Sequence, residues 1–310
     1  MAGIINQTVV TEFILLGFSY QTRIKYTMFF IFLVVYVVTL IANSLVILVI
    51  LTDSHFNSPM YFFLCNLSLI DLCYSSSSIP KSLEGMVANR SAITFPGCAA
   101  QMYCGLALGV AQCILLAVMA WDRYVAICRP LNYQVIMNKS VCYRLALITW
   151  CSAFLLSLVF VSVTLTTPFC GKHQIDHSAC ETKAVLRLAC TDIHVREAVI
   201  FLMSVAILFI PVCIIFFTYT YIIFTILRMP SASGRHKAFS TCGSHLTVVI
   251  LFFGTAMAMY LSPTSKNSAE NNKVMSLFYG AVTPMLNPLI YTLRNNEVKG
   301  AVHRLFCRKT

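Results

Sequence analysis

Long stretches of this chain carry almost no charge, and the polar residues gather in short segments between them. Apolar runs of about 20 residues or more, the length that crosses a bilayer as a helix, lie near 26–51, 60–82, 98–121, 141–163, 197–227, 239–261 and 272–293. Runs of this length predict membrane-spanning helices. We therefore expect an all-α membrane protein, a bundle of seven transmembrane helices whose two termini lie on opposite sides of the membrane.

Composition supports this interpretation. The chain of 310 residues is 58% hydrophobic and only 11% charged, with a mean hydropathy of +0.79, as expected of a protein whose main solvent is lipid. No repeat or linker interrupts the pattern. We expect a single domain over residues 1–310, divided into an N-terminal segment at 1–25, a helix bundle at 26–293 and a tail at 294–310.

The tail combines apolar and basic residues at helical spacing. This pattern predicts a short amphipathic helix in the membrane interface; its apolar residues are Val298, Ala301, Val302, Leu305 and Phe306. Cys307 beside them is a candidate site of palmitoylation.

A glycosylation acceptor sets the expected orientation. Asn6-Gln7-Thr8 fits the N-x-S/T pattern and is usable only outside the cell, which predicts an extracellular N-terminus, a cytoplasmic tail and a multi-pass protein of the plasma membrane. Asn89 opens a second acceptor. The net charge of +11 then falls mostly on the cytoplasmic face, where it suits anionic membrane lipid and an acidic partner surface. Nucleic acid is not an expected partner, because no soluble basic domain is present.

The chain has fourteen cysteines, too many for a single disulfide framework. Their positions in the sequence therefore have to show which of them can form disulfides. Four lie in segments predicted to face outward, where the secretory route favours disulfides; they are Cys98, Cys170, Cys180 and Cys190. Four cysteines allow three pairings, and the residues themselves leave the choice open. The loop of about 33 residues between spans four and five is long for an ordered connection, so we expect disulfides to pin it as a lid.

Several strings carry a more specific signal. Asp122-Arg123-Tyr124 closes the third span, within Met119-Ala120-Trp121-Asp122-Arg123-Tyr124-Val125-Ala126-Ile127-Cys128. An isolated triplet of this kind is often just an ion pair that anchors a helix end. Here Pro59-Met60-Tyr61-Phe62-Phe63-Leu64, Lys237-Ala238-Phe239-Ser240-Thr241-Cys242-Gly243-Ser244-His245-Leu246 and Pro284-Met285-Leu286-Asn287-Pro288-Leu289-Ile290-Tyr291 accompany it in order. Together they closely resemble the olfactory receptors, a branch of the rhodopsin-like G-protein-coupled receptors, over nearly the whole chain.

The resemblance implies an odorant receptor that binds a small hydrophobic volatile and activates a heterotrimeric stimulatory G protein of the olfactory type, raising cyclic AMP. From the residues themselves, we expect no enzymatic activity, cofactor or bound metal. The resemblance also implies a disulfide between Cys98 and Cys180, leaving Cys170 with Cys190. Arg123 would contact the C-terminal helix of the G protein, with Asp122 holding it at rest. In the active state, Tyr219 and Tyr291 would close toward Arg123.

Asp71 is a carboxylate in mid-membrane, which marks a paired or functional site. We expect Asn43 and Asn287 as its partners, in a cluster that either rearranges on activation or is a static network. Pro288 permits a local bend in the seventh span. Gln112 stands where members of the family often carry Glu, so a cation site shared with Asp71 would lose one ligand.

Counting helical turns outward from Arg123 predicts a ligand cavity. Its expected lining is Gly105, Leu106, Gly109, Val110, Cys113, Met203, Ser204, Ile207, Ala256, Met257, Tyr260, Leu277 and Gly280. Tyr260 and Ser204 are the candidate hydrogen-bonding groups, although each residue alone could be ordinary packing. Receptors for biogenic amines place a carboxylate at the position of Gly105, so its absence favours a neutral ligand.

Other functions have weaker support. A rhodopsin-like receptor for a small metabolite would share the same fold. A seven-span transporter would need inverted repeats or several ionisable residues along a path, yet Asp71 is the only acidic residue deep in the predicted spans. His173 and His177 are four residues apart, but two histidines make a weak metal site. No phosphate loop or catalytic set is visible in the sequence.

Overall fold

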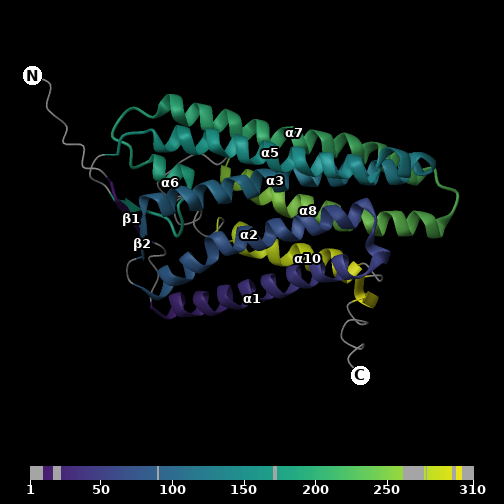
Figure 1. Cartoon of the computed structure of the whole chain (residues 1–310), viewed down its shortest axis with the longest axis horizontal. Helices are drawn as coiled ribbons and strands as arrows, with labels where there is room; N and C mark the ends of the chain where they lie inside the picture. The colour runs from purple at the N-terminus through teal and green to yellow at the C-terminus, as the bar shows by residue number, and fades with distance from the viewer. Residues whose placement is uncertain are drawn as a thin grey trace, which may run out of the picture.

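A computed structural model describes residues 10–16, 22–88, 91–169, 173–260, 276, 278–294 and 298–301. Long helices run side by side along its longest axis (Figure 1). Six are long and apolar enough to cross a membrane: α1 (Thr22–Thr52), α2 (Pro59–Val87), α3 (Phe95–Cys128), α5 (Lys139–Leu165), α7 (His194–Leu227) and α8 (Ala232–Tyr260). A π-helical turn, η4 (Phe278–Val282), continues directly into α10 (Thr283–Arg294) and supplies the seventh. The predicted seven-helix membrane fold is confirmed.

Helix α3 is the most buried of the six long helices and packs against α2, α5 and α7. The outer helices instead expose large apolar side chains, such as Phe30 and Ile41 of α1 and Phe216 of α7. A lipid-facing helix satisfies its backbone hydrogen bonds internally and presents apolar side chains to the hydrocarbon. The core of the bundle therefore lies around α3.

Several helices begin outside the apolar runs, at positions that residues at their N-terminal ends determine. The Thr94 hydroxyl accepts a hydrogen bond from the Gly97 amide at 3.2 Å and begins α3. The Asn138 side chain does the same for the Val141 amide at 3.0 Å and begins α5. Pro59 starts α2 at a position where its missing N–H costs nothing.

Short elements join the helices. They are η1 (Ser54–Phe56), η2 (Pro130–Asn132) and α4 (Tyr133–Ile136) at one end of the bundle, and α6 (Thr182–Leu186) in the loop before α7. Residues 298–301 are helical, and Val298 and Ala301 pack against the main core. The remainder of the predicted tail helix, with Cys307, lies outside the described residues.

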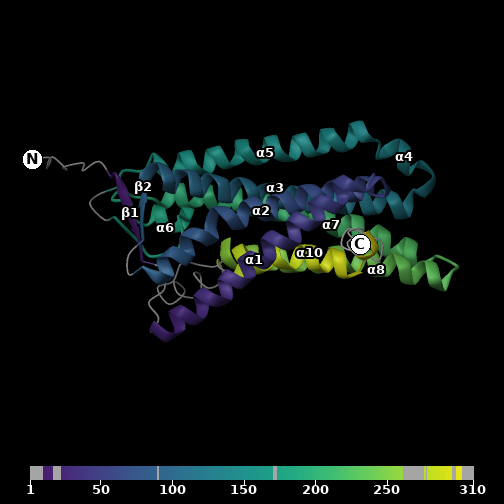
Figure 2. The ribbon, with the colours of Figure 1, turned by 60° about the horizontal axis from the view of Figure 1, so that its bottom comes forward.

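A three-stranded sheet covers one end of the bundle, and the apolar pattern did not predict it. Strand β1 (Glu12–Leu15) lies between β2 (Ser91–Thr94) and β3 (Gln174–Ile175). It pairs antiparallel with β2 and parallel with β3. Figures 1 and 2 both place these strands and α6 at the end opposite the turn that joins α7 to α8.

Phe13 fixes β1 in place. Its side chain is fully buried, with ring centroids 5.9 Å from Phe95 and 6.0 Å from Phe169. The same apolar cluster contains Cys98 and Cys180. The N-terminal strand is thus part of the structure that roofs the bundle.

Candidate functional site

A cavity of about 40 Å³ lies among the helices toward the end covered by the sheet. Its wall consists of Gly105, Leu106, Gly109, Val110, Cys113, Phe160, Ser204, Ile207, Leu208, Ala256, Tyr260 and Tyr279. Five of these come from α3, and their spacing along the helix is the one counted from Arg123. None of the described wall residues carries a charge, so the cavity suits a neutral ligand.

Three wall residues were not predicted: Phe160, Leu208 and Tyr279. Phe160 lies on α5, which the helix-turn counting did not include. Tyr279 lies in the π-helical turn η4, where wider winding changes the direction in which successive side chains point. A second phenol therefore stands beside Tyr260.

The remaining predicted lining residues lie elsewhere. Met203 packs in a neighbouring cluster with Phe160, Leu186 and Ile200, and Met257 packs against the main core. Gly280 lines a second cavity. Leu277 falls outside the described residues. Whether the wall residues bind a ligand stays a prediction.

The polar groups on the wall differ in how they are satisfied. The Ser204 hydroxyl donates to the Ile200 carbonyl of its own helix at 2.8 Å, so it can offer a ligand only an acceptor. The hydroxyls of Tyr260 and Tyr279 donate to no other described residue. A buried phenol usually finds a hydrogen-bond partner, and these two are open to a ligand.

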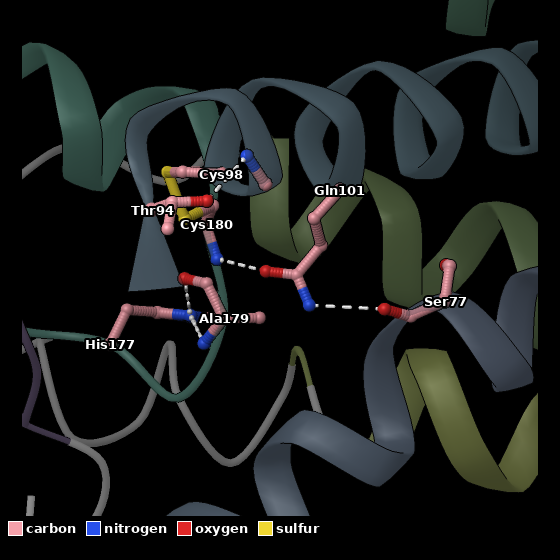
Figure 3. The surroundings of a disulfide bond; sticks show 8 residues. Ser77, Thr94, Cys98, Gln101, His177, Ala179 and Cys180 are labelled. Carbon is pink, nitrogen blue, oxygen red and sulfur yellow. Dashed lines mark hydrogen bonds between the residues drawn. A yellow bond between two sulfur atoms is a disulfide. The ribbon is translucent and has the colours of Figure 1, made fainter. Parts of the chain in front are cut away.

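The predicted disulfide between Cys98 and Cys180 is present and joins α3 to the lid. Figure 3 shows Gln101 beside it, one helical turn further along α3. The Gln101 amide oxygen accepts a hydrogen bond from the Cys180 N–H at 2.9 Å, and its amide nitrogen donates to the Ser77 carbonyl of α2 at 3.0 Å. Gln101 thus ties α2, α3 and the lid together. Cys190 is also disulfide-bonded, and Cys170, its expected partner, lies outside the described residues.

A second contact links the lid to α8. The Lys183 ammonium of α6 donates to the carbonyls of Tyr260, at 2.7 Å, and Met259, at 3.3 Å. A cation is favourable at the C-terminal end of a helix, where carbonyls lack partners. Burial lowers the pKa of Lys183, and the nearby Glu181 carboxylate opposes that shift. The lid therefore holds the wall-forming end of α8.

The mid-membrane carboxylate has one of its two expected partners. Asn287 donates to both oxygens of Asp71, at 3.1 and 3.0 Å. Asn43 instead donates to the Pro284 carbonyl at 3.0 Å and to a carbonyl of its own helix. The expected contact of Asn43 with Asp71 is wrong in this structure, because the α10 backbone near Pro288 offers a freer acceptor.

Near the C-terminal end of α3, Asp122 and Arg123 do not form the expected ion pair. No oxygen of Asp122 lies within 4.0 Å of Arg123 among the ion pairs of the described residues, whereas the Tyr133 hydroxyl donates to Asp122 at 2.8 Å. Burial and the Asp122 carboxylate raise the pKa of Tyr133, which keeps that hydroxyl protonated. Asp122 is held by α4, and Arg123 stays available.

Arg123 lies near a group of polar side chains inside the bundle. The members of this group are Tyr219, Cys242, His245 and Tyr291. The Tyr219 hydroxyl is hydrogen-bonded to the His245 ring at 2.9 Å, and the other ring nitrogen lies 3.2 Å from the Leu116 carbonyl. His245 thereby links α8 to α7 and α3. The Tyr291 hydroxyl is buried without a hydrogen bond.

Two other predicted coupling residues, Tyr124 and Pro288, lie on α3 and α10. Tyr124 packs against Trp121 of its own helix, with ring centroids 5.2 Å apart, and against Tyr221 of α7 at 6.1 Å. Pro288 lies inside α10. The glycosylation candidates Asn6 and Asn89 fall outside the described residues. Contact of these side chains with a G protein stays a prediction.

Comparison with known proteins agrees with the resemblance seen in the motifs. Residues 32–309 match the family described as olfactory receptor. Human olfactory receptor 2B2 is 49% identical over 304 residues, covering 98% of this chain and 85% of that protein. Human olfactory receptor 2K2 and the dog olfactory receptor-like protein OLF3 are each 48% identical over 305 residues, covering 98% of this chain and 96% of each relative. Since both the match and the identity extend over almost its full length, the chain belongs to the olfactory receptor family and is a multi-pass membrane receptor, not an enzyme.

Proposed function

We propose that the protein is an odorant receptor that binds a small, neutral, hydrophobic volatile between its helices. Binding then activates a heterotrimeric stimulatory G protein of the olfactory type and raises cyclic AMP. The observation that carries this proposal is the uncharged cavity on the outer half of α3, the same helix whose inner end bears Arg123. One rigid element thus connects the two candidate sites.

The chemistry of the wall supports a neutral ligand. Apolar side chains and glycines form most of it, and two free phenol hydroxyls supply polar contacts. A cationic amine would need a carboxylate to offset its loss of water, and Glu181 of the lid lies on neither this wall nor that of the second cavity. Glu181 is paired with His177 at 3.1 Å.

The size of the cavity supports a mechanism that involves movement. A volume of about 40 Å³ is far below the roughly 300–1,000 Å³ of most small-molecule sites. A ligand must therefore favour a wider arrangement of the helices, and it shifts the population toward that arrangement. Helix α8 carries Ala256 and Tyr260 on the cavity wall and His245 near Arg123. A displacement of α8 would therefore change both the cavity and the surroundings of Arg123.

The inner end supports coupling to a partner. Because Asp122 accepts from Tyr133, the Arg123 guanidinium can donate its five N–H groups to backbone carbonyls of a docking helix. The basic charge of the chain favours an acidic partner surface and anionic lipid there.

The disulfide supports an extracellular position for the sheet. A disulfide between Cys98 and Cys180 persists on the oxidising side of a membrane, and β1 shares an apolar cluster with it. The N-terminal strand would then lie outside the cell, with Arg123 facing the cytoplasm at the plasma membrane. Removal of N-linked glycans should increase the electrophoretic mobility of the mature receptor, and substitution of Asn6 should reduce that shift. An unchanged mobility would argue for the opposite orientation.

A cyclic-AMP reporter screen over a panel of volatiles tests the proposed function. Cells expressing the chain at the surface should respond to at least one neutral hydrophobic compound. Arg123→Ala, matched for surface level, should bind the same compound and give no cyclic AMP. A full response of Arg123→Ala would refute the assigned role of that residue, and a receptor selective for charged amines would refute the ligand class.

A further inference from the structure

A second cavity, also of about 40 Å³, is built by different residues from the first. Its wall comes from α1, α2, the lid and the seventh helix, and includes Tyr74, Ser78, Ser82, Ser178 and Gly280. The lid residue Ala179, which Figure 3 shows beside Gln101, is also part of its wall. No described residue lines both cavities.

Two tyrosines separate the cavities. Tyr74 lines the second cavity and Tyr279 lines the first. Their rings meet edge to face, with centroids 5.6 Å apart and planes at 89°. A glycine lies beside each ring: a Cβ on Gly109 would lie 3.4 Å from the Tyr279 hydroxyl and a Cβ on Gly280 would lie 3.5 Å from the Tyr74 ring, both ordinary contact distances. We call Tyr74 and Tyr279 the tyrosine partition.

The partition offers polar groups to a ligand. The hydroxyls of Tyr74 and Tyr279 form no hydrogen bond with another described residue, and each tyrosine lines one of the two cavities. A phenol hydroxyl can both donate and accept a hydrogen bond. A ligand with an oxygen near the partition can therefore bind to it.

The second cavity is richer in hydroxyls than the first. Serines face it from α2, the lid and the seventh helix. The Ser82 hydroxyl donates to the carbonyls of Ser78, at 3.1 Å, and Ser178, at 3.3 Å, which leaves its oxygen lone pairs free to accept. None of the described wall residues of this cavity is charged. It therefore suits a neutral group that donates and accepts hydrogen bonds.

We propose that the two cavities are one divided ligand site. The apolar body of the ligand occupies the first cavity, and a neutral oxygen-bearing end, such as an alcohol, reaches past the tyrosine partition to the serines of the second. The partition has to move for this, since neither cavity alone holds a chain of several carbons. This inference rests on the proposed function in taking the first cavity as the odorant site.

Straight-chain primary alcohols of four to ten carbons test the divided site. Binding is measured as thermal stabilisation of the purified receptor, which needs no G protein, alongside the cyclic-AMP response. Ser82→Ala should weaken binding of every responsive alcohol by about two- to twelve-fold, the change expected for one neutral hydrogen bond. Ser78→Val narrows the second cavity and should shift the preferred alcohol to a shorter chain.

Ser76→Ala is the matched control, because Ser76 is exposed on the same helix and lines neither cavity. It should leave affinity and preferred chain length unchanged. The divided site is refuted if no alcohol stabilises the wild-type receptor, or if folded Ser78→Val and Ser82→Ala both bind the series as wild type does. Stabilisation without any cyclic-AMP response would instead refute the proposed coupling and leave the divided site standing.

Discussion

Gly109→Ala is the sharpest test of the first cavity, because it adds one methyl group at a known place on the wall. The new Cβ would lie 3.4 Å from the Tyr279 hydroxyl oxygen, an ordinary contact distance. The substitution should therefore fold, and alanine in place of glycine favours a helix by about 1 kcal/mol. A loss of potency would then reflect the ligand site and not the stability of the receptor.

The size of the effect follows from the volume that the methyl group takes. A cavity of about 40 Å³ has no spare room for it, so a ligand that fills the site must give up contact equal to about one methylene. Burial of one methylene is worth about 0.8 kcal/mol, which corresponds to a loss of about four-fold in potency. An agonist one carbon shorter should recover that loss, because it vacates the space that the methyl group occupies.

The assay is a set of dose-response curves for an identified agonist and its shorter homologue, in cells matched for surface receptor. Gly254→Ala is the control, since Gly254 also lies in a long transmembrane helix, has nothing within 4 Å of its added Cβ and does not line the cavity. Equal potency of Gly109→Ala and Gly254→Ala would show that the ligand does not occupy this cavity.

Three further predictions concern the lid. Lys183→Met removes two charge-assisted hydrogen bonds to the end of α8, worth about 1–2 kcal/mol at a half-exposed site. It should raise the cyclic-AMP level without ligand several-fold, whereas Lys183→Arg should not. An unchanged basal level in Lys183→Met would contradict a role of this contact in holding α8. Cys98→Ser and Cys180→Ser each remove a disulfide that joins residues 82 apart in the sequence, a cross-link worth about 4.5 kcal/mol of stability. Each should abolish surface expression, measured by flow cytometry, and the double variant should be no worse. Additive losses would argue against the pairing. Gln101→Met leaves the part-buried Cys180 N–H without its acceptor and removes the contact with the Ser77 carbonyl, which keeps its helical partner within α2. An unpaired N–H costs about 1–3 kcal/mol, so the melting temperature of the purified receptor should fall. An unchanged melting temperature would show that Gln101 does not hold the lid.

The long helices could be predicted from sequence because lipid imposes a simple rule. A segment in hydrocarbon must satisfy its own backbone and present apolar side chains, so the pattern along the chain is enough to place it. The residues of α3 that line the first cavity could be predicted for a similar reason, because helical periodicity places Gly105 and Gly109 at known positions relative to Arg123. The family motifs then indicated the pairing of Cys98 with Cys180.

The remaining features depend on contacts between distant segments. The π-helical turn put Tyr279 on the first cavity and Gly280 on the second, a change that regular helical spacing does not contain. Asn43 and Asp122 found partners on backbone or loop segments, Pro284 and Tyr133, that no local pattern relates to them. Strands of two and four residues are too short for alternation to be recognised.

The position of β1 at the middle of its sheet has a consequence for how the receptor is made. One neighbour, β2, is synthesised about 80 residues after it, and the other, β3, about 160 residues after it. Strand β1 therefore leaves the ribosome before either of its partners, and its pairing is completed only after the four long helices α1, α2, α3 and α5, and then β3, have been made. Closure of the sheet-covered end of the bundle then becomes a late quality check in biogenesis, because a chain with a wrongly inserted helix would still have β1 unpaired.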